Sequence, residues 1–325
     1  MIAFLSRRLL QSAFVLFAMS VLVFIGIFAI GNPVDVLIAP EATQADRQRI
    51  IESLGLDRSL IEQYVSFVQG VIGGDFGKSF VFKISAISLI LDRLPATLEL
   101  AVTAMIFSVL VGLPLGMLAG MYPDSLLGRS IMAGSILGFS MPTFWVGLIL
   151  IMVFAVHLGW LPSTGRGETV TMLGIKWSFL TRDGLAHLVL PAFNLALFKI
   201  SLVIRLTRAG MRDALASDYV RYAIAKGLYP RRVVMVHALK NILIPLVTVL
   251  GLEFGSVIAF AIVTETIFAW PGTGKLIIES INSLDRPVIV AYLMVIVLMF
   301  VTINLIVDIT YSILDPRIRL GGASS

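Results

Sequence analysis

Cysteine is absent from this 325-residue sequence, and histidine occurs only three times. Without cysteine there can be no disulfide, no thiolate chemistry and no metal site with cysteine ligands. His157, His187 and His237 lie far apart and show none of the short spacings that histidine metal ligands use. The sequence therefore predicts no metal site.

Motifs for nucleotide binding and catalysis are also missing. The segment Trp270-Pro-Gly-Thr-Gly-Lys275 is rich in glycine, but it lacks the Gly-x-x-x-x-Gly-Lys-Ser/Thr spacing of a phosphate-binding loop. The sequence also lacks paired carboxylates and a nucleophile beside a base, which are the residue groups that would indicate an enzyme. We predict that the chain has no catalytic residue and no cofactor of its own.

Charged residues are scarce, at 14% of the chain, whereas 58% of residues are hydrophobic and the mean hydropathy is +0.96. A soluble domain of this length could not bury so much apolar surface, so the bilayer is the expected solvent. The net charge of +5 is modest and is better explained by cytoplasmic loops than by nucleic-acid binding.

Six apolar runs are each long enough to cross about 30 Å of hydrocarbon. We expect an all-α integral membrane protein with six transmembrane helices, at 9–30, 96–120, 131–158, 185–205, 242–264 and 288–313. The first run follows Arg7 and Arg8, as in a signal peptide, but it is too long for one and no Ala-x-Ala site closes it. It is predicted to be an uncleaved span.

The spans divide the chain into regions. We expect an N-terminal tail and first span at 1–31, an extracytoplasmic cap at 32–95, a five-helix core at 96–313 and a cytoplasmic tail at 314–325. Helical periodicity within the cap predicts amphipathic stretches at 42–54 and 60–71. The core contains a polar, basic segment at 207–240, between the fourth and fifth spans.

Lysine and arginine counts predict the orientation of the chain. With the N-terminus inside, thirteen basic residues face the cytoplasm and five face outside, leaving aside the long first loop, whose charge matters little. Both termini and the segment 207–240 are therefore predicted to be cytoplasmic.

Small residues and prolines within the spans predict close helix packing and helix breaks. Glycines recur four residues apart at Gly112, Gly116 and Gly120, a spacing that lets helix backbones approach closely in lipid. Pro142 is expected to kink or start a helix, as are Pro114 and Pro191.

Ionisable residues within spans are costly and are therefore candidates for a transport pathway. Glu253 is the strongest of these, and Lys199 is a candidate to pair with it across the bundle. Glu99 and Glu265 lie near the outer ends of their spans, where an interfacial position is the alternative to a pathway role.

The basic segment contains a short helix with defined ends. Ser217 or Asp218 is placed to cap its start, and Gly227 is placed to end it in a left-handed conformation. Tyr219 and Tyr222 offer rigid contacts of the kind that dominate interfaces, so this helix is a candidate docking element. A basic loop that contacts anionic lipid is the alternative.

The run Asp218-Tyr-Val-Arg-Tyr-Ala-Ile-Ala-Lys-Gly-Leu228 resembles the cytoplasmic signature of permease subunits of binding-protein-dependent ABC importers, in the dipeptide, oligopeptide and nickel branch. Essentially the whole chain shares the resemblance, through Pro95-Ala-Thr-Leu-Glu-Leu100, Met141-Pro-Thr-Phe-Trp145, His187-Leu-Val-Leu-Pro191, His237-Ala-Leu-Lys-Asn241, Thr264-Glu-Thr-Ile-Phe-Ala-Trp-Pro-Gly-Thr-Gly274 and Leu314-Asp-Pro-Arg-Ile-Arg319. The Glu-Ala-Ala form of the wider superfamily is not matched at Arg221 and Tyr222, which argues against a sugar permease of the standard kind.

The resemblance implies a coupling helix that docks on a cytosolic ATPase subunit. The residues it assigns to this role are Asp218, Tyr219, Arg221, Tyr222, Ala223, Ala225, Lys226, Gly227 and Leu228. Because Ala223 and Ala225 have small side chains, we expect the helix to lie close to the partner surface at these positions. The implied partners are a second homologous permease, two ABC ATPases that bind ATP and Mg²⁺, and an extracytoplasmic substrate-binding protein, with the complex in the bacterial inner membrane.

The resemblance implies ATP-driven import of dipeptides and oligopeptides by alternating access. Nickel, glutathione and short oligosaccharides are the alternative substrates, because specificity in such systems resides largely in the binding protein. A stand-alone channel or secondary transporter is the alternative class. It predicts inverted repeats and ion-coordinating groups at the midplane, neither of which is clear in the sequence.

Overall fold

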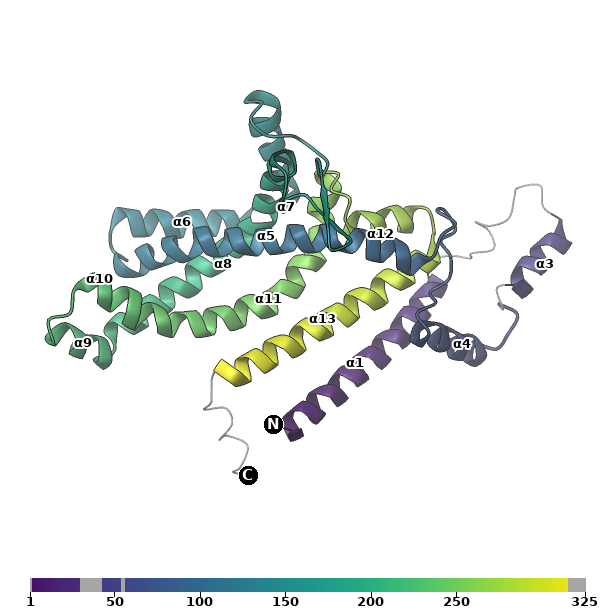
Figure 1. Cartoon of the computed structure of the whole chain (residues 1–325), viewed down its shortest axis with the longest axis horizontal. Helices are drawn as coiled ribbons and strands as arrows, with labels where there is room; N and C mark the ends of the chain where they lie inside the picture. The colour runs from purple at the N-terminus through teal and green to yellow at the C-terminus, as the bar shows by residue number, and fades with distance from the viewer. Residues whose placement is uncertain (1, 30–42, 54–55, 315–325) are drawn as a thin grey trace. The chain divides into compact units, whose positions relative to one another are not determined.

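The protein is described by a computed structural model over residues 2–29, 43–53 and 56–314 (Figure 1). Its α-helices, in chain order, are α1 (Ile2–Ala29), α3 (Gln44–Ser53), α4 (Leu60–Ile72), α5 (Ala86–Met121), α6 (Leu126–Ser140), α7 (Thr143–Leu150), α8 (Arg182–Ala216), α9 (Asp218–Ala225), α10 (Pro230–Arg232), α11 (Leu239–Ile267), α12 (Thr273–Asn282) and α13 (Arg286–Leu314). Two π-helices, η1 (Ile151–His157) and η2 (Val233–Ala238), follow α7 and α10 directly.

The chain divides into two compact units. The first comprises residues 1–95 and 272–305, and the second comprises residues 96–271 and 306–325. The described residues of the expected cap, 43–53 and 56–95, lie in the same unit as α1 and α12.

Among the described residues, five helices are long and apolar enough to cross a membrane, and the count rises to six if one bent pair is taken as a single span. The five segments are Ser6–Gly26, Ala86–Met121, Arg182–Ala216, Pro245–Ile267 and Arg286–Ile309. The bent pair is α6 with α7 and η1, whose axes differ by 105°.

The span expected at 131–158 is broken between α6 and α7. Met141 takes an extended conformation (ψ 134°), and so does Pro142 (ψ 128°), which directly precedes the first residue of α7. Proline disfavours a helical conformation in the residue before it, which explains the position of the break. The expectation that Pro142 starts a helix is confirmed.

The second unit is held together along α8, which packs against α5, α6 and α11 (Figure 1). A Cβ atom added to Gly112, Gly116 or Gly120 of α5 would lie 2.6–2.7 Å from the side chain of Val203, Thr207 or Met211 of α8, respectively. These distances are too short for any side chain. The glycine spacing therefore serves helix packing, as expected.

A β-hairpin was not anticipated by the all-α prediction. Strands β1 (Val170–Met172) and β2 (Ile175–Trp177) pair antiparallel across a two-residue turn. Leu173 and Gly174 both have positive φ, as a tight turn of this type requires. Leucine rarely occupies such a position, so the sequence carried no hairpin signal.

In the first unit, α4 confirms the amphipathic helix predicted at 60–71, and α3 forms a polar helix within the stretch predicted at 42–54. Ser59 and Glu62 form a reciprocal capping box at the start of α4, and the hydrogen bonds from Ser59 lower the pKa of the Glu62 carboxyl. In the same unit, hydrogen bonds join the segment before α5 to the turn before α13. The buried Asp285 carboxylate accepts hydrogen bonds from the Ser79 hydroxyl and from the backbone N–H groups of Phe80 and Val81.

Candidate functional sites

The short helix expected in the basic segment is present as α9 (Asp218–Ala225). Gly227 follows it with φ of 76°, and its N–H donates to the Ile224 carbonyl at 2.9 Å. The Leu228 N–H reaches back to the Ala223 carbonyl at 3.3 Å, which completes a left-handed helix end. The predicted role of Gly227 as the end of this helix is confirmed.

The start of α9 differs from the expectation. Ser217 occupies the N-cap position, but its side chain makes no capping hydrogen bond. Its hydroxyl donates instead to the Ala214 carbonyl at the end of α8. Ser217 therefore satisfies the end of the preceding helix, not the start of α9.

One face of α9 packs on the chain itself. Val220 and Ala223 are buried in a cluster with Val233 of η2, against which Leu215 and Leu228 also pack. Ala223 is only 5% exposed. The expectation that Ala223 lies against a partner is therefore wrong, because its small size serves the packing of α9 on its own subunit.

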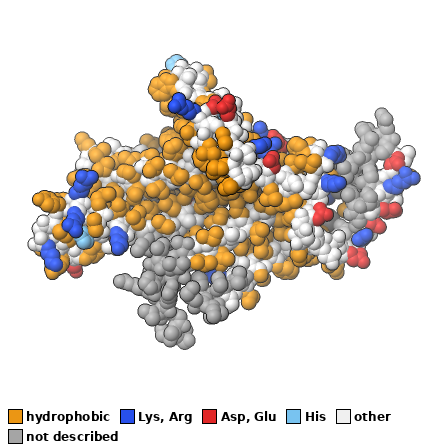
Figure 2. Space-filling view, in the orientation of Figure 1, with side chains coloured by type: hydrophobic (Ala, Val, Ile, Leu, Met, Phe, Trp, Pro, Cys, Tyr) orange, Lys and Arg blue, Asp and Glu red, His pale blue; other side chains and the backbone are white. Residues whose placement is uncertain are grey.

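The opposite face of α9 is open. Tyr219 is 43% exposed and Tyr222 is 63% exposed, and Ala225 also lies on this surface. The Lys226 ammonium lies 4.6 Å from the centre of the Tyr222 ring, and the Arg221 guanidinium lies 3.7 Å from the Asp218 carboxylate. Lysine and arginine side chains gather at this end of the second unit, around α9 and α10 (Figure 2). The result is a basic surface with two aromatic rings held on a packed helix.

Within the apolar part of the second unit, α8 and α11 are joined by an ion pair. The Lys199 ammonium donates hydrogen bonds to the Glu253 carboxylate and, at 2.7 Å, to the Ser256 hydroxyl. Ser256 in turn donates to the same carboxylate oxygen at 2.8 Å. The Lys199 side chain is 6% exposed and that of Glu253 is 33% exposed. The predicted pair is thus formed, with its cation buried and its carboxylate partly open.

Aromatic rings continue from this pair towards α6. The ring of Phe198 lies 5.5 Å from the Lys199 ammonium and stacks on Phe139 at 4.3 Å between ring centres. The Arg205 guanidinium lies 4.6 Å from the Phe139 ring. Sequence reasoning missed this row of two cations and two rings, because its members come from two helices that only the fold brings together.

Glu99 is buried and fully hydrogen-bonded. Arg166 donates to one carboxylate oxygen through Nε at 3.0 Å and Nη2 at 2.6 Å, and the N–H groups of Ser178 and Phe179 donate to the other at 2.7 and 2.9 Å. Arg166 also donates to the Lys176 carbonyl in β2. Glu99 therefore holds the hairpin segment in place, a role that the sequence did not indicate.

Glu265 is also buried, with 0% of its surface exposed, and Thr97 donates to its carboxylate at 2.7 Å. Both Glu99 and Glu265 thus lie inside the protein, and neither carboxylate is open to solvent.

The structure contains no metal centre in the part of the chain that it describes. No three His, Asp or Glu side chains gather there in a way that could hold an ion.

Two family models match the sequence. One, described as "Binding-protein-dependent transport system inner membrane component", matches residues 112–320. The other describes the N-terminal region of such membrane components and matches residues 1–101. Between them they span nearly the whole chain.

Curated relatives match over almost their full lengths. The "Oligopeptide transport system permease protein AppB" of Bacillus subtilis is 41% identical, over 98% of this chain and 100% of its own. The "Di/tripeptide transport system permease protein DppB" of Pseudomonas aeruginosa is 39% identical, over 98% and 99%. The "Glutathione transport system permease protein GsiC" of Escherichia coli is 36% identical, over 98% and 99%.

Among solved structures, a chain of the MetNI methionine ABC transporter in an inward-facing conformation is similar in fold. The TM-score is 0.53, over 70% of this chain and 96% of that chain, at 16% sequence identity. At this identity the likeness concerns the fold alone.

Proposed function

Because the chain belongs to the family of inner membrane components of binding-protein-dependent transport systems, we propose that it is the permease subunit of an ATP-driven importer for dipeptides and oligopeptides. Peptides are favoured because the permeases of peptide systems named above share 39% and 41% identity with the chain. Glutathione, itself a small peptide, is the alternative suggested by the relative at 36% identity.

The observation that carries the proposal is the two-sided packing of α9. Its Val220 and Ala223 face is anchored on the chain's own helices, while Tyr219 and Tyr222 face outward beside basic side chains. Exposed tyrosines on a fixed helix suit a protein interface, since little conformational entropy is lost when they are covered. We assign this open face to docking on an ATPase subunit.

The proposed complex contains a second homologous permease, two ATPase subunits that bind ATP and Mg²⁺, and an extracytoplasmic binding protein. The family description, which specifies dependence on a binding protein, supports the last of these. We propose six spans, with α6, α7 and η1 together forming the third, and both termini in the cytoplasm. The count of basic residues supports this orientation.

Transport is proposed to proceed by alternating access. Closure of the ATPase pair on ATP moves α9, and α8 and η2, which contact α9, carry the displacement into the membrane. The energy delivered equals the difference in partner contacts between the two states. The Lys199–Glu253 pair is proposed to line the pathway, because its carboxylate is partly open and a peptide carries charged ends.

Two alanines of α9 provide a matched test of docking. A leucine at exposed Ala225 is expected to reduce both co-purification of ATPase subunits and peptide uptake, without lowering the thermal denaturation midpoint. A leucine at buried Ala223 is expected to destabilise the packing of α9 by about 1–3 kcal/mol, as overpacking of a core does. Both are measured on a complex purified through a tag on this chain.

The opposite result would identify a different docking surface. Normal uptake and normal ATPase recovery with Ala225→Leu at normal expression contradict the assignment of the open face of α9. A tagged chain that transports peptide with no ATP-hydrolysing subunit attached contradicts the importer itself and favours a stand-alone transporter.

A further inference from the structure

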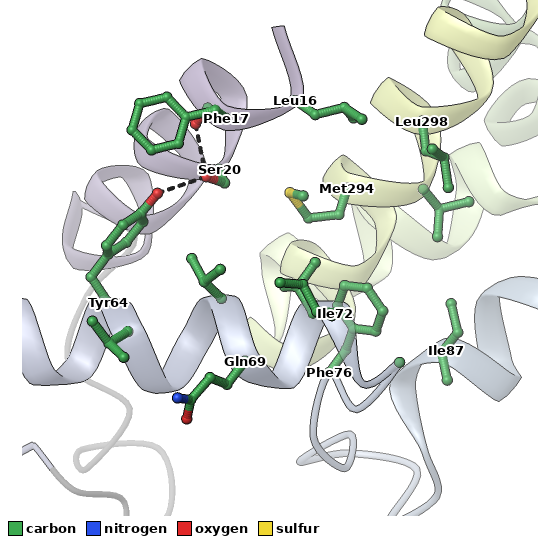
Figure 3. Close-up of a pocket in the computed structure, with 15 residues that line it drawn as sticks. Leu16, Phe17, Ser20, Tyr64, Gln69, Ile72, Phe76, Ile87, Met294 and Leu298 are labelled. Atoms are coloured by element: carbon green, nitrogen blue, oxygen red, sulfur yellow. Dashed lines mark hydrogen bonds between the residues drawn. The ribbon is translucent and has the colours of Figure 1, made fainter. Parts of the chain in front are cut away.

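A large apolar cavity lies within the first unit. It has a volume of about 700 Å³ and is enclosed by α1, α4, the beginning of α5 and α13 (Figure 3). Leu16 of α1 and Met294 of α13 extend toward one another across this space, and Ile72 and Phe76 rise into it from the end of α4 and the turn that follows. Its size falls within the range of roughly 300–1,000 Å³ that is usual for ligand sites.

The lining offers no recognition group for a polar ligand. Its hydroxyl groups already bond to protein atoms, since Ser20 donates to the Phe17 carbonyl at 2.7 Å and lies 2.8 Å from the Tyr64 hydroxyl, to which it is hydrogen-bonded. The Gln69 side chain points away from the cavity (Figure 3). None of the described side chains that line it is charged. The occupant must therefore be apolar where it contacts these walls.

The position of the cavity identifies the solvent that reaches it. Leu16 lies within the apolar segment Ser6–Gly26, and Met294 and Leu298 lie within Arg286–Ile309, both long enough to span a membrane. An opening between two such helices faces lipid hydrocarbon. The fourth wall, α4, is amphipathic and exposes Leu60 and Ile61, which do not line the cavity, at 62% and 76%, as a helix at the membrane surface does.

We propose that this cavity binds one acyl chain of a membrane lipid, which completes the packing of α1 against α4 and α13. An unfilled space of this size forfeits dispersion contacts along all its walls, and water gains too few hydrogen bonds there to fill it. α1 contributes little else to the core, since only 12% of its apolar segment is buried. The inference depends on membrane insertion and is independent of the cargo.

Photocrosslinking tests the occupant directly. The complete transporter is placed in nanodiscs of phosphatidylethanolamine and phosphatidylglycerol that contain a trace of phosphatidylglycerol with a diazirine at the middle of one acyl chain. Lipid adducts are then mapped by peptide mass spectrometry. Adducts at Leu16 and Met294 are expected to exceed those at Phe14, which lies on the same helix, close to the depth of Leu16, and is 68% exposed. Equal labelling of Leu16 and Phe14 overturns the proposal.

Filling the cavity supplies the second arm. Val68→Trp is expected to reduce the adducts at Leu16 and Met294 to the level at Phe14, whereas Ile61→Trp, on the exposed part of α4, leaves them unchanged. If the tryptophan variant does not assemble, Val68→Leu is expected to lower the same adducts in part. Unchanged adducts in every Val68 variant that assembles contradict the site.

Lipid dependence of stability completes the test. A ligand that binds only the folded state raises the denaturation midpoint with its concentration. Adding phosphatidylglycerol to the delipidated transporter is expected to raise the midpoint of the wild type and of Ile61→Trp more than that of Val68→Trp. Equal gains in all three overturn the proposal. Displacement of the Leu16 adducts by a transported peptide also overturns it, and assigns the cavity to cargo.

Discussion

Glu99 and Glu253 each neutralise a cation inside the second unit, but they are held in different ways. Glu99 accepts two hydrogen bonds from Arg166 and two from backbone N–H groups, and its side chain is 1% exposed. Glu253 bonds to two side chains, Lys199 and Ser256, and remains 33% exposed.

The difference separates an ion pair that fixes structure from one that can change partners. The donors to Glu99 include backbone groups and the planar guanidinium of an arginine, which is always charged and has a rigid geometry. The donor to Glu253 is a lysine, whose ammonium is carried on a flexible stem of four carbons. The first pair holds the hairpin segment, and the second, whose carboxylate is partly exposed, is the pair that we propose lines the pathway.

Glu99→Ala is expected to have the largest effect. It leaves Arg166 buried without its carboxylate, and breaking a buried pair in this way costs about 3–5 kcal/mol. The purified transporter should show a lower denaturation midpoint and faster proteolysis near the β1–β2 hairpin. Glu168→Ala is the matched control, because Glu168 is an exposed carboxylate in the same loop region. An equal denaturation midpoint in both variants would show that Glu99 does not hold the hairpin segment in place.

Glu253→Ala is expected to destabilise less, by roughly 1–3 kcal/mol, because Ser256 still accepts from Lys199. Peptide uptake should fall more than stability does. Glu253→Gln, which keeps a hydrogen-bond acceptor but removes the charge, separates the two effects. If it restores stability and not uptake, the charge acts in transport. If it restores both, the pair is only structural and the contrast with Glu99 disappears.

Ser256→Ala should have the smallest effect, about 1 kcal/mol or less, since the ion pair itself remains. Combined with Glu253→Ala it should lose more than the sum of the two single changes, because the buried Lys199 ammonium then keeps neither of its two acceptors. Denaturation midpoints of both single variants and the double variant measure this coupling. Strict additivity would mean that Ser256 does not support the pair.

Local signals in the sequence were sufficient for α9 and its end. Gly227 can take the left-handed conformation at no steric cost, and Pro230 prevents continuation of the helix. The sequence therefore predicted both the end of α9 and the turn that follows it. The face that α9 buries was not readable, because Ala223 and Ala225 are identical residues and only the contact with Val233 distinguishes them.

Ion-pair partners far apart in the sequence were predictable only where few ionisable residues were available to pair. Lys199 and Glu253 could be matched because few ionisable residues occur inside the spans. Arg166 could not be matched to Glu99, since it lies in a polar loop among several other charges and its partner is 67 residues away. Pro142 predicted where the helix breaks after α6, but it did not predict the 105° angle between the two helix axes.

The glycine contacts between α5 and α8 have a mechanical consequence. Val203, Thr207 and Met211 each fit over one glycine of α5, so sliding or rotating one helix on the other would drive side chains into backbone. The two helices must therefore move as one rigid body. α9 follows α8 after a single residue. A displacement of α9 is therefore transmitted through α8 to α5, because α8 and α5 do not shift against each other.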